Sequence, residues 1–374
     1  MDFVKPVSFK IYAFNLPLKY PVIVAGKKLS HRSGLLLELG DEKGSSGWGE
    51  VSPLPGLHRQ TAQECLNELV SAFEKDYLGN IDIDANSPLD SVAKLSSLLT
   101  SPASRFGLES AFLNLLATAQ NTNPAALLNT NYARAVYING LLIDSGEDAV
   151  WEIARLYALG YRSVKIKTGR HNLNEELENL RRILAETPAD MRFRLDANRR
   201  WTLDEALHFV KGLPAGKIEY VEEPLKNPQD LPRFCAESPF PVALDETLRQ
   251  PDYREYLSLP GVGTAILKPA VLGGIRTVME RTKEARREGC SVVISDTFSG
   301  GVGLATHLAL AAALSENTAA GLDTYRYLRQ DLLARPLTVS SGRMDVDENM
   351  NRARQVNRAL LSHRITVYEN PLSH

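Results

Sequence analysis

The sequence predicts an α/β protein built around a (β/α)8-type TIM barrel, with a smaller α+β unit at its N-terminal end. Two observations predict this fold. From about residue 134, short runs of strand-forming residues alternate with segments whose apolar residues recur at helical spacing. Before that point, two strand-like runs lead into a stretch with helical periodicity. Eight strands alternating with helices over roughly 200 residues are the expectation for a barrel of this type.

The barrel is assigned to residues 131–325. Its strand candidates are residues 136–142, 163–167, 192–196, 218–222, 242–245, 265–268, 292–295 and 321–323. The first helical segments between them are residues 147–159, 173–186 and 203–212. A doubly wound open sheet is the alternative, but no Gly-x-Gly-x-x-Gly motif follows the first strand of the repeat. The closed barrel is therefore preferred.

Residues 1–130 are expected to form the separate α+β unit. The strands and helices expected there are residues 8–15, 33–39, 60–75, 89–99 and 105–120. The C-terminal segment, residues 326–374, contains Pro336 and Gly342 and is expected to pack back on the N-terminal unit.

Composition and charge favour small-molecule chemistry. The 374 residues have a formal net charge of −2 and no long run of like charge, so nothing indicates binding to nucleic acid or to an anionic membrane. Cys65, Cys235 and Cys290 provide neither a disulfide framework nor a CxxC motif. The sequence has no membrane-spanning stretch and no signal-peptide core. We expect a soluble cytoplasmic protein, monomeric or homo-oligomeric, that acts on a small molecule.

Several strand candidates end in an ionisable residue, and five consecutive ones end in Lys167, Asp196, Glu222, Asp245 and Lys268. The intervals between them are 29, 26, 23 and 23 residues, about the length of one βα unit. Because the carboxyl ends of barrel strands share one rim, these side chains are expected to meet. One such residue alone is better explained as the solvated end of a strand. Five charged residues at nearly constant intervals predict a functional site.

A second lysine, Lys165, precedes Lys167 by two positions, so both side chains face the barrel interior. Three nearby carboxylates repel one another unless a cation lies among them. Oxygen ligands select a hard ion, so we expect Mg²⁺, with Mn²⁺ as a substitute. The histidines show no zinc-binding spacing, and His58, His171 and His307 are expected to be surface or structural residues.

This arrangement predicts removal of a proton next to a carboxylate. A metal that holds the substrate carboxylate stabilises the charge formed when the adjacent carbon loses its proton. The base could be a lysine whose pKa is lowered by burial and by a neighbouring ammonium, and Lys165 beside Lys167 supplies that charge. A lysine or histidine base paired with Mg²⁺ is a known arrangement for this chemistry.

Five segments resemble, in order, motifs of the muconate-lactonizing branch of the enolase superfamily. Ser163–Lys167 resembles the KxK motif, Arg194–Asn198 the RxDAN motif and Val221–Leu225 the EEP motif. Asp245–Thr247 and Ile266–Pro269 complete the set. The resemblance spans nearly the whole chain and implies that residues 1–130 are a capping domain completed by the C-terminal segment.

The resemblance implies a role for each site residue. Asp196, Glu222 and Asp245 would be the metal ligands, Lys167 the acid and base, and Lys268 the facing cation that stabilises the intermediate.

Two further roles are implied by the resemblance. Lys165 would tune Lys167, and Asn198 would support the site and the substrate by hydrogen bonding. Resemblance alone favours Glu222 over Glu223 as the ligand.

Within the branch, Gly47–Gly56 resembles a segment of the o-succinylbenzoate synthases, and Gly321–Thr324 resembles their last barrel strand. A functional role would place Pro55 and Gly56 in a capping loop that closes over the substrate, whereas turn chemistry alone explains the stretch equally well. Arg32 is expected to be a solvated loop arginine, with contact to the substrate as the alternative.

Ser299, Gly300 and Gly301 depart from the pattern, because many relatives carry an acidic residue and a serine there. Amide groups of such a turn at a helix start could still hold a substrate carboxylate. The implied activity is dehydration of 2-succinyl-6-hydroxy-2,4-cyclohexadiene-1-carboxylate. The alternatives are an N-succinylamino acid racemase or dipeptide epimerase and, from another class, a barrel that binds without catalysis.

Overall fold

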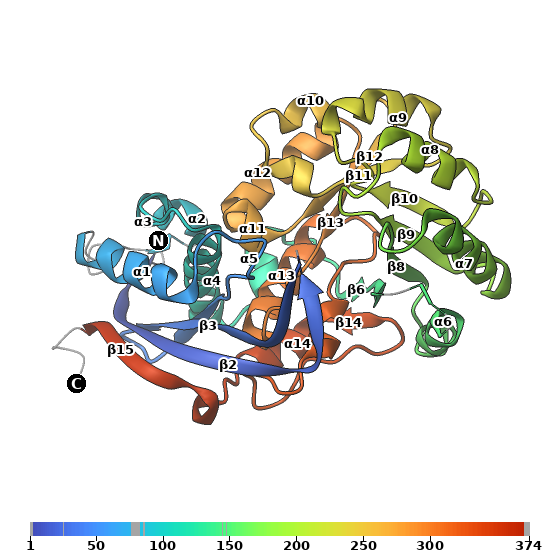
Figure 1. Ribbon diagram of the computed structural model, residues 1–374. Coiled ribbons are helices and arrows are strands. Elements are labelled where there is room, and N and C mark those ends of the chain that lie inside the picture. Colours follow the sequence, from blue (N-terminus) through green and yellow to red (C-terminus); the bar gives the residue numbers. More distant parts are fainter. Residues whose placement is uncertain are drawn as a thin grey trace.

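The computed structural model describes residues 3–24, 26–75, 83–84, 87–143, 145–146 and 148–369. Figure 1 shows two parts of the molecule. One part contains an antiparallel sheet with its helices, and the other contains a curved parallel sheet surrounded by helices. The helix α13 (Gly301–Leu314) lies between the two parts. This is the predicted α/β barrel with an N-terminal cap. Among the described residues, no helix has both the length and the apolar character needed to cross a bilayer.

The capping sheet has the strand order β15-β2-β3-β4. Its strands are β2 (Pro6–Val24), β3 (Lys27–Asp41), β4 (Ser46–Val51) and β15 (Ser362–Glu369). The pairing of β15 with β2, for example Ile365 with Ile11, joins the C-terminal segment to this sheet. The helices of this part are α1 (Ala62–Lys75), α2 (Pro88–Ser91), α3 (Ala93–Ser97), α4 (Pro102–Ala119) and α5 (Pro124–Leu128). The short strands β1 (Phe3–Val4) and β5 (Ile83–Asp84) pair with each other.

The barrel sheet has seven parallel strands among the described residues, in the order β13-β12-β11-β10-β9-β8-β7. They are β7 (Gly140–Leu142), β8 (Ser163–Lys167), β9 (Arg192–Asp196), β10 (Ile218–Glu222), β11 (Val242–Leu244), β12 (Val262–Leu267) and β13 (Ser291–Ile294). The helices between and after them are α6 (Ala149–Ala158), α7 (Leu173–Glu186), α8 (Leu203–Lys211), α9 (Leu231–Glu237), α10 (Tyr253–Leu257), α11 (Pro269–Leu272), α12 (Ile275–Arg287) and α13.

The eighth strand position differs from the prediction. Residues 321–323 do not form a strand; Gly321 makes a single parallel bridge to Ser295, and Ala320 makes one to Ile138. Asp323 already begins a 3-10 helix, Asp323–Tyr327. The backbone groups nevertheless connect the two sheet edges, because Gly321 N donates to Ile294 O at 2.9 Å and Asn139 N donates to Ala320 O at 3.0 Å. Residues 321–323 do not extend as a strand because the chain turns into the 3-10 helix at Asp323.

The first predicted strand is also divided. Residues 136–142 form β6 (Ala135–Tyr137) and β7, with Ile138 and Asn139 between them. β6 pairs with β14 (Arg343–Asp345) outside the barrel sheet, and α14 (Val346–Ala353) follows β14.

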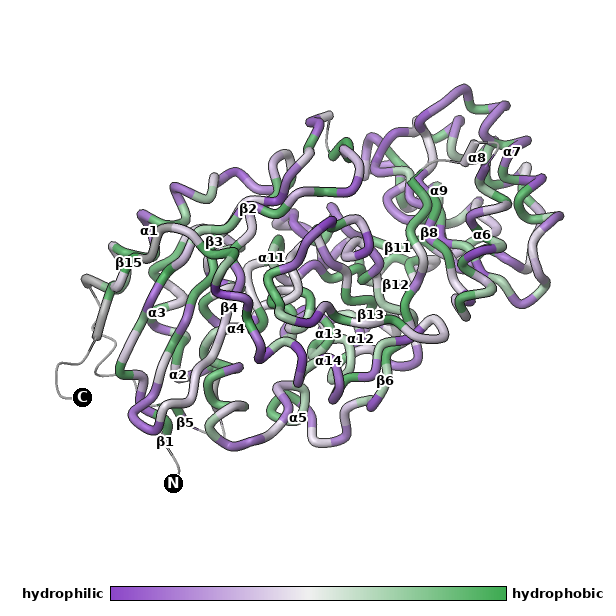
Figure 2. The backbone as a smooth tube through the Cα atoms, turned by 90° about the horizontal axis from the view of Figure 1, so that it is seen from below, coloured by the Kyte–Doolittle hydropathy of each residue, from purple (hydrophilic) through white to green (hydrophobic). Residues whose placement is uncertain are grey.

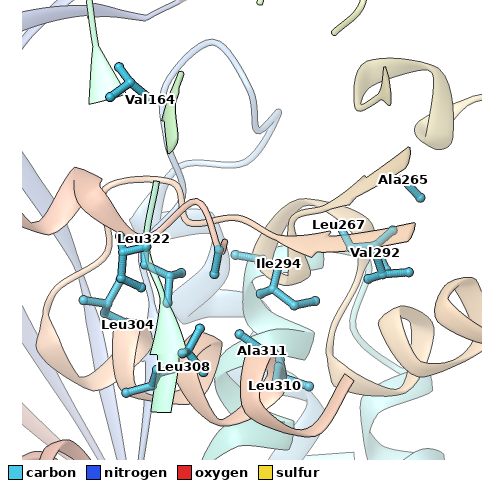
Figure 3. Close-up of a cluster of buried hydrophobic side chains, with 14 of the residues drawn as sticks. Val164, Ala265, Leu267, Val292, Ile294, Leu304, Leu308, Leu310, Ala311 and Leu322 are labelled. Carbon is cyan, nitrogen blue, oxygen red and sulfur yellow. The ribbon is translucent and has the colours of Figure 1, made fainter. Parts of the chain in front are cut away.

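The helix α13 links the two parts of the core. Every residue of α13 is buried, because all its residues except Thr306 and His307 are apolar or glycine and the helix packs against both the barrel and the capping sheet. Figure 3 shows Leu304, Leu308 and Ala311 from α13 beside Ile294 of β13 and Leu322. Each fully buried leucine contributes roughly 1.5–3 kcal/mol of transfer free energy. In Figure 2 hydrophobic residues gather along the strands and α13 in the middle of the molecule.

Close approach of β4 to α4 requires glycine on both elements. A Cβ atom on Gly49 would lie 1.9 Å from the Gly107 carbonyl oxygen, and one on Gly107 would lie 2.2 Å from Val51 Cγ2. The two elements are therefore in backbone contact, which holds residues 46–51 and the loop after them in place.

We predict that Gly49→Ala lowers the free energy of unfolding by about 2 kcal/mol, because the new methyl group overpacks the contact with α4. Urea unfolding followed by circular dichroism measures the change. Gly263→Ala on β12 is the control, because its Cβ would meet only Pro241 Cβ at 3.5 Å. Equal stability of the two variants would contradict this account of the contact.

Candidate active site

A cavity of about 460 Å³ opens at the carboxyl ends of the barrel strands. Residues of the capping hairpin β2–β3 and of the loop after β4 complete its wall. Of the residues proposed for the site, Lys165, Lys167, Lys268 and Asn198 line this cavity. Asp196, Glu222 and Asp245 are not part of the lining, but each is in contact with one of these lysines.

Lys165 connects two of the carboxylates. Its Nζ lies 2.7 Å from Asp196 Oδ2 and 2.6 Å from Glu222 Oε1. The register of the sheet explains the contact, because Lys165 pairs with Arg194 on β9, and Asp196 pairs with Glu222 on β10. The alternation of the strand points Lys165 inward and leaves Ile166 facing the helices. Two carboxylates from adjacent strands thus share the Lys165 ammonium.

Lys167, the next inward residue, has a different environment. Its Nζ donates to Asp196 Oδ2 at 2.5 Å and to Asn198 Oδ1 at 2.8 Å. Burial and the ammonium of Lys165 lower the pKa of Lys167, although Asp196 opposes this. For Lys165 the balance is reversed: burial would lower its pKa, but Asp196 and Glu222 outweigh burial and raise the pKa well above its ordinary value. Lys165 is therefore a fixed cation, whereas Lys167 releases its proton more readily.

The two carboxylates beside Lys165 also differ. Burial would raise the pKa of Asp196, but the two ammonium groups outweigh it and the pKa falls below its ordinary value. Burial and the nearby Asp196 raise the pKa of Glu222 to about 8. Glu222 Oε2 is buried and has no hydrogen-bond partner. The position of Glu222 therefore lacks part of the positive charge that a buried carboxylate requires.

The opposite side of the site carries Lys268 and Asp245, which form an ion pair. Burial would lower the pKa of Lys268, but Asp245 outweighs it and raises the pKa. Lys268 directly follows β12 and Asp245 directly follows β11, so the two neighbouring strand ends place them together. Lys167 and Lys268 consequently face the same cavity from different strands.

Glu223 has a structural role on the reverse side of β10. Its Oε1 accepts from Asp245 N at 2.8 Å and Thr247 N at 2.6 Å, and its Oε2 accepts from Arg199 Nε at 2.7 Å. Glu222 and Glu223 therefore face opposite sides, and Glu223 holds the backbone that carries Asp245.

Glu246 is a site residue that sequence reasoning missed. It lines the cavity, its Oε1 accepts from Asn198 Nδ2 at 3.2 Å, and burial raises its pKa to about 7. The sequence feature that could have indicated a role for Glu246 is its position next to Asp245. Asn198 itself has φ 43°, so its amide lies between Lys167 and Glu246 only because the loop after β9 turns sharply.

Pro55 and Gly56 are not among the residues that line the cavity, whereas Leu54 and Leu57 on either side of them are. The loop is fixed by His58, whose Nδ1 accepts from Leu54 N at 2.8 Å and whose Nε2 lies 2.8 Å from Ala270 O. The capping loop thus reaches the cavity through its apolar side chains.

Ser299, Gly300 and Gly301 do not line the cavity, and their amide groups have acceptors within the chain. Gly300 N donates to Glu50 Oε1 at 2.7 Å, and Gly301 N donates to Asp331 Oδ1 at 2.7 Å. Ser299 N lies 3.0 Å from an Asp296 carboxylate oxygen. The expected role as donors to a substrate carboxylate is corrected, because side-chain carboxylates of the chain already occupy these donors.

The expectation of a solvated Arg32 is wrong. Arg32 is 1% exposed, and it donates to Ser52 O at 2.6 Å and Phe298 O at 2.9 Å. Burial lowers its pKa to about 10 against the effect of Glu50. Arg32 thus joins the capping sheet to the loop after β13, where Phe298 has φ 58° and lines the cavity.

Two family models match the chain. The model described as "Enolase C-terminal domain-like" matches residues 148–350, and "MenC, N-terminal domain" matches residues 7–115. The chain belongs to the enolase superfamily.

Two o-succinylbenzoate synthases resemble most of the chain. The o-succinylbenzoate synthase of Edwardsiella ictaluri is 31% identical over 328 residues, which cover 86% of this chain and 92% of the relative. That of Escherichia coli is 29% identical over 320 residues, 85% and 90% of the two chains.

Solved structures share the fold. A dipeptide epimerase from Enterococcus faecalis complexed with Mg and a dipeptide has a TM-score of 0.82 and 20% identity, covering 96% of this chain and all of the other. Muconate lactonizing enzyme from Pseudomonas fluorescens has a TM-score of 0.77 and 20% identity, covering 96% of both chains.

Asp196, Glu222 and Asp245 suit Mg²⁺, the hard dication that superfamily members typically bind. In this structure each of the three carboxylates contacts a lysine ammonium group. Among the residues that the structure describes, no group of three or more His, Cys, Asp or Glu side chains is arranged around one point. The ammonium groups of Lys165 and Lys268 supply the counter-charge instead. The donors are all carboxylate oxygens at the ends of three neighbouring strands, and the unpartnered Glu222 Oε2 is available to a cation.

We predict that the buried Glu50 makes the stability of the protein depend on pH. Burial raises the pKa of Glu50 to about 7 from its ordinary 4.5. The folded chain therefore keeps a proton that the unfolded chain has lost, so its stability falls as pH rises from about 4.5 to about 7. Relative to Glu50→Gln, the free energy of unfolding should fall by roughly 3 kcal/mol across this window.

Urea unfolding of both proteins at several pH values between 4.5 and 7.5 measures the difference. A difference that stays constant across these pH values would show that Glu50 is ionised in the folded chain.

Proposed function

We propose that this chain catalyses the dehydration of 2-succinyl-6-hydroxy-2,4-cyclohexadiene-1-carboxylate to 2-succinylbenzoate, a step of menaquinone or phylloquinone synthesis. The observation that carries the proposal is that Lys167 and Lys268 face one cavity, each paired with a carboxylate from the end of a barrel strand. The match of residues 7–115 to the MenC N-terminal model and the synthases at about 30% identity support this activity over others in the superfamily.

Asp196, Glu222 and Asp245 would hold Mg²⁺. When bound, the ion supplies Lewis-acid stabilisation for the negative charge that develops on the substrate carboxylate. The solved dipeptide epimerase that shares the fold is complexed with Mg. Glu223 keeps the backbone of Asp245 in position, because its Oε1 accepts a hydrogen bond from Asp245 N.

Lys167 acts first as the base. Its lowered pKa favours the neutral amine, which takes the proton from the ring carbon that bears the carboxylate. The resulting ammonium then donates a proton to the departing hydroxyl group on the neighbouring carbon, so one water leaves and Lys167 returns to its starting state. Lys165 remains a cation throughout, because Asp196 and Glu222 raise its pKa.

Lys268 stays protonated and faces the substrate. Its raised pKa makes it a poor base, so it stabilises the negative charge of the intermediate instead of accepting a proton. Val22, Leu54 and Phe298 provide apolar contacts around the substrate carbon atoms and keep water from the reacting centre.

Racemisation of N-succinylamino acids or epimerisation of dipeptides is the second candidate. It is favoured by the structural similarity to dipeptide epimerases and by the presence of two lysines facing one cavity, which could exchange protons on opposite faces of a substrate. The raised pKa of Lys268 argues for the dehydration, which needs only one base.

We predict that the purified protein with Mg²⁺ forms the aromatic product from the cyclohexadiene substrate and that EDTA abolishes the reaction. Ultraviolet absorbance of 2-succinylbenzoate measures it. Loss of optical rotation in N-succinyl amino acids and dipeptides is followed in parallel, and racemisation without aromatic product would favour the second candidate.

The non-catalytic alternative has its own control. Mg²⁺ should raise the melting temperature of the wild type, because a ligand of the folded state stabilises it. Absence of any shift, together with absence of both activities, would favour a barrel that only binds.

We predict that Lys167→Ala lowers the rate by about 10³-fold or more, because the general base and the general acid are lost together. The melting temperature should still rise with Mg²⁺, since Lys167 is not a ligand. Lys211→Ala removes an exposed lysine that pairs with Glu237 and serves as the matched control. Undiminished dehydration by the Lys167 variant would reject its assignment.

A further inference from the structure

The cavity has two arginines that the proposed mechanism does not use. Arg170 and Arg200 both line it and lie on adjacent loops, after β8 and after β9. We propose that Arg200, with Arg170 beside it, is a specificity-determining residue that binds the second carboxylate of the substrate, at the end of its succinyl group. This inference rests on the proposed function, which places the first carboxylate at the lysine and carboxylate cluster.

Arg200 is held by a rigid turn. The two preceding residues, Asn198 and Arg199, have left-handed backbone conformations with φ 43° and 59°. Arg199 N donates to Glu223 O at 2.7 Å, and Arg200 N donates to Ala197 O at 3.1 Å. Since the backbone on which it stands is fixed by neighbouring strand ends, Arg200 is presented to the cavity at a defined place.

The stem of Arg200 packs over Gly169. A Cβ atom on Gly169 would lie 2.9 Å from Arg200 Cβ and 3.4 Å from Arg200 Cδ, and Gly169 has φ 71°. The absence of a side chain at Gly169 therefore leaves room for the arginine stem along the loop after β8. This contact brings Arg200 next to Arg170, the residue that follows Gly169.

The charges that line the cavity leave Arg200 available to an anion. Lys165, Lys167 and Lys268 are each ion-paired with a carboxylate. Arg200 forms no ion pair or hydrogen bond through its side chain with any residue that the structure describes, and Arg170 Nη1 lies 3.4 Å from Ile143 O. Because guanidinium groups match carboxylates in shape and charge, a substrate carboxylate is the fitting partner.

Burial places Arg200 at the mouth of the cavity. The side chains of Lys165, Lys167 and Lys268 are 11%, 18% and 13% exposed, whereas Arg200 is an exposed residue. Apolar residues, among them Leu54 and Ile143, line the same cavity. The polarity of the cavity therefore suits a molecule with a carboxylate at each end and a carbon framework between them.

The same feature separates the two candidate substrate classes of the superfamily. A succinyl group ends in a carboxylate, which a guanidinium attracts, whereas a dipeptide carries an ammonium group, which it repels. Arg200 therefore favours succinylated substrates over dipeptides.

The test compares Arg200→Gln and Arg200→Lys with Arg182→Gln, which removes an exposed arginine of α7 outside the cavity lining. In the Mg²⁺-loaded enzyme, Arg200→Gln should raise KM for the cyclohexadiene substrate roughly three- to tenfold and change kcat less than about twofold. Arg200→Lys should restore part of the affinity. Because the contact is exposed, the effect should shrink as ionic strength rises.

A binding measurement separates this inference from the proposed function. Calorimetry of the Mg²⁺-loaded proteins with 2-succinylbenzoate and with benzoate, and with N-succinyl- and N-acetylphenylalanine, reports on the distal carboxylate whichever reaction occurs. A preference for the succinyl compound that Arg200→Gln reduces supports the inference, even where the wild type forms no aromatic product. A KM and a succinyl preference that change no more in Arg200→Gln than in Arg182→Gln would overturn it, even where the wild type is an active dehydratase.

Discussion

The arrangement of the active-site end of the barrel depends on the pairing of buried lysines with buried carboxylates. Lys165 contacts both Asp196 and Glu222, so three neighbouring strands share one cluster of charges. Removing one partner from such a cluster leaves a buried charge uncompensated, which costs roughly 3–5 kcal/mol. The cluster therefore fixes the strand ends, and it also divides the lysines chemically. The pKa of Lys165 rises and that of Lys167 falls, although the two residues lie on one strand and two positions apart.

A second buried group of charges joins the capping domain to the barrel. Glu50 accepts from the amides of Gly300 and Gly303 at the start of α13, and Arg32 donates to Phe298 O. Because Phe298 lines the cavity, this contact with the capping sheet helps to fix the cavity wall. A helix N-terminus favours the binding of an acidic group. Here the amide donors at the start of α13 bind the carboxyl group of Glu50, which is part of the protein itself.

Much of the fold could be predicted from local patterns. The runs 163–167, 192–196 and 218–222 coincide with β8, β9 and β10, because alternation and flanking turn residues are local properties of the chain. The eighth strand was not predicted correctly, since a bridge of single residues at Ala320 and Gly321 takes its place and is followed at once by a helical turn. A three-residue run gives no signal that distinguishes a strand from such a bridge.

The order and spacing of the charged residues were sufficient to indicate which side chains reach the rim of the barrel, because the βα repeat converts sequence intervals into neighbouring strand ends. The partners of those side chains were decided only by the tertiary structure. Glu50 and Gly300 are 250 positions apart, and their contact depends on how the capping sheet docks on the loop after β13. The same holds for Arg200, which lies beside Gly169 through the packing of two separate loops. Local sequence carries the direction of a strand and its alternation, but it does not carry the relative placement of surfaces that meet only after folding.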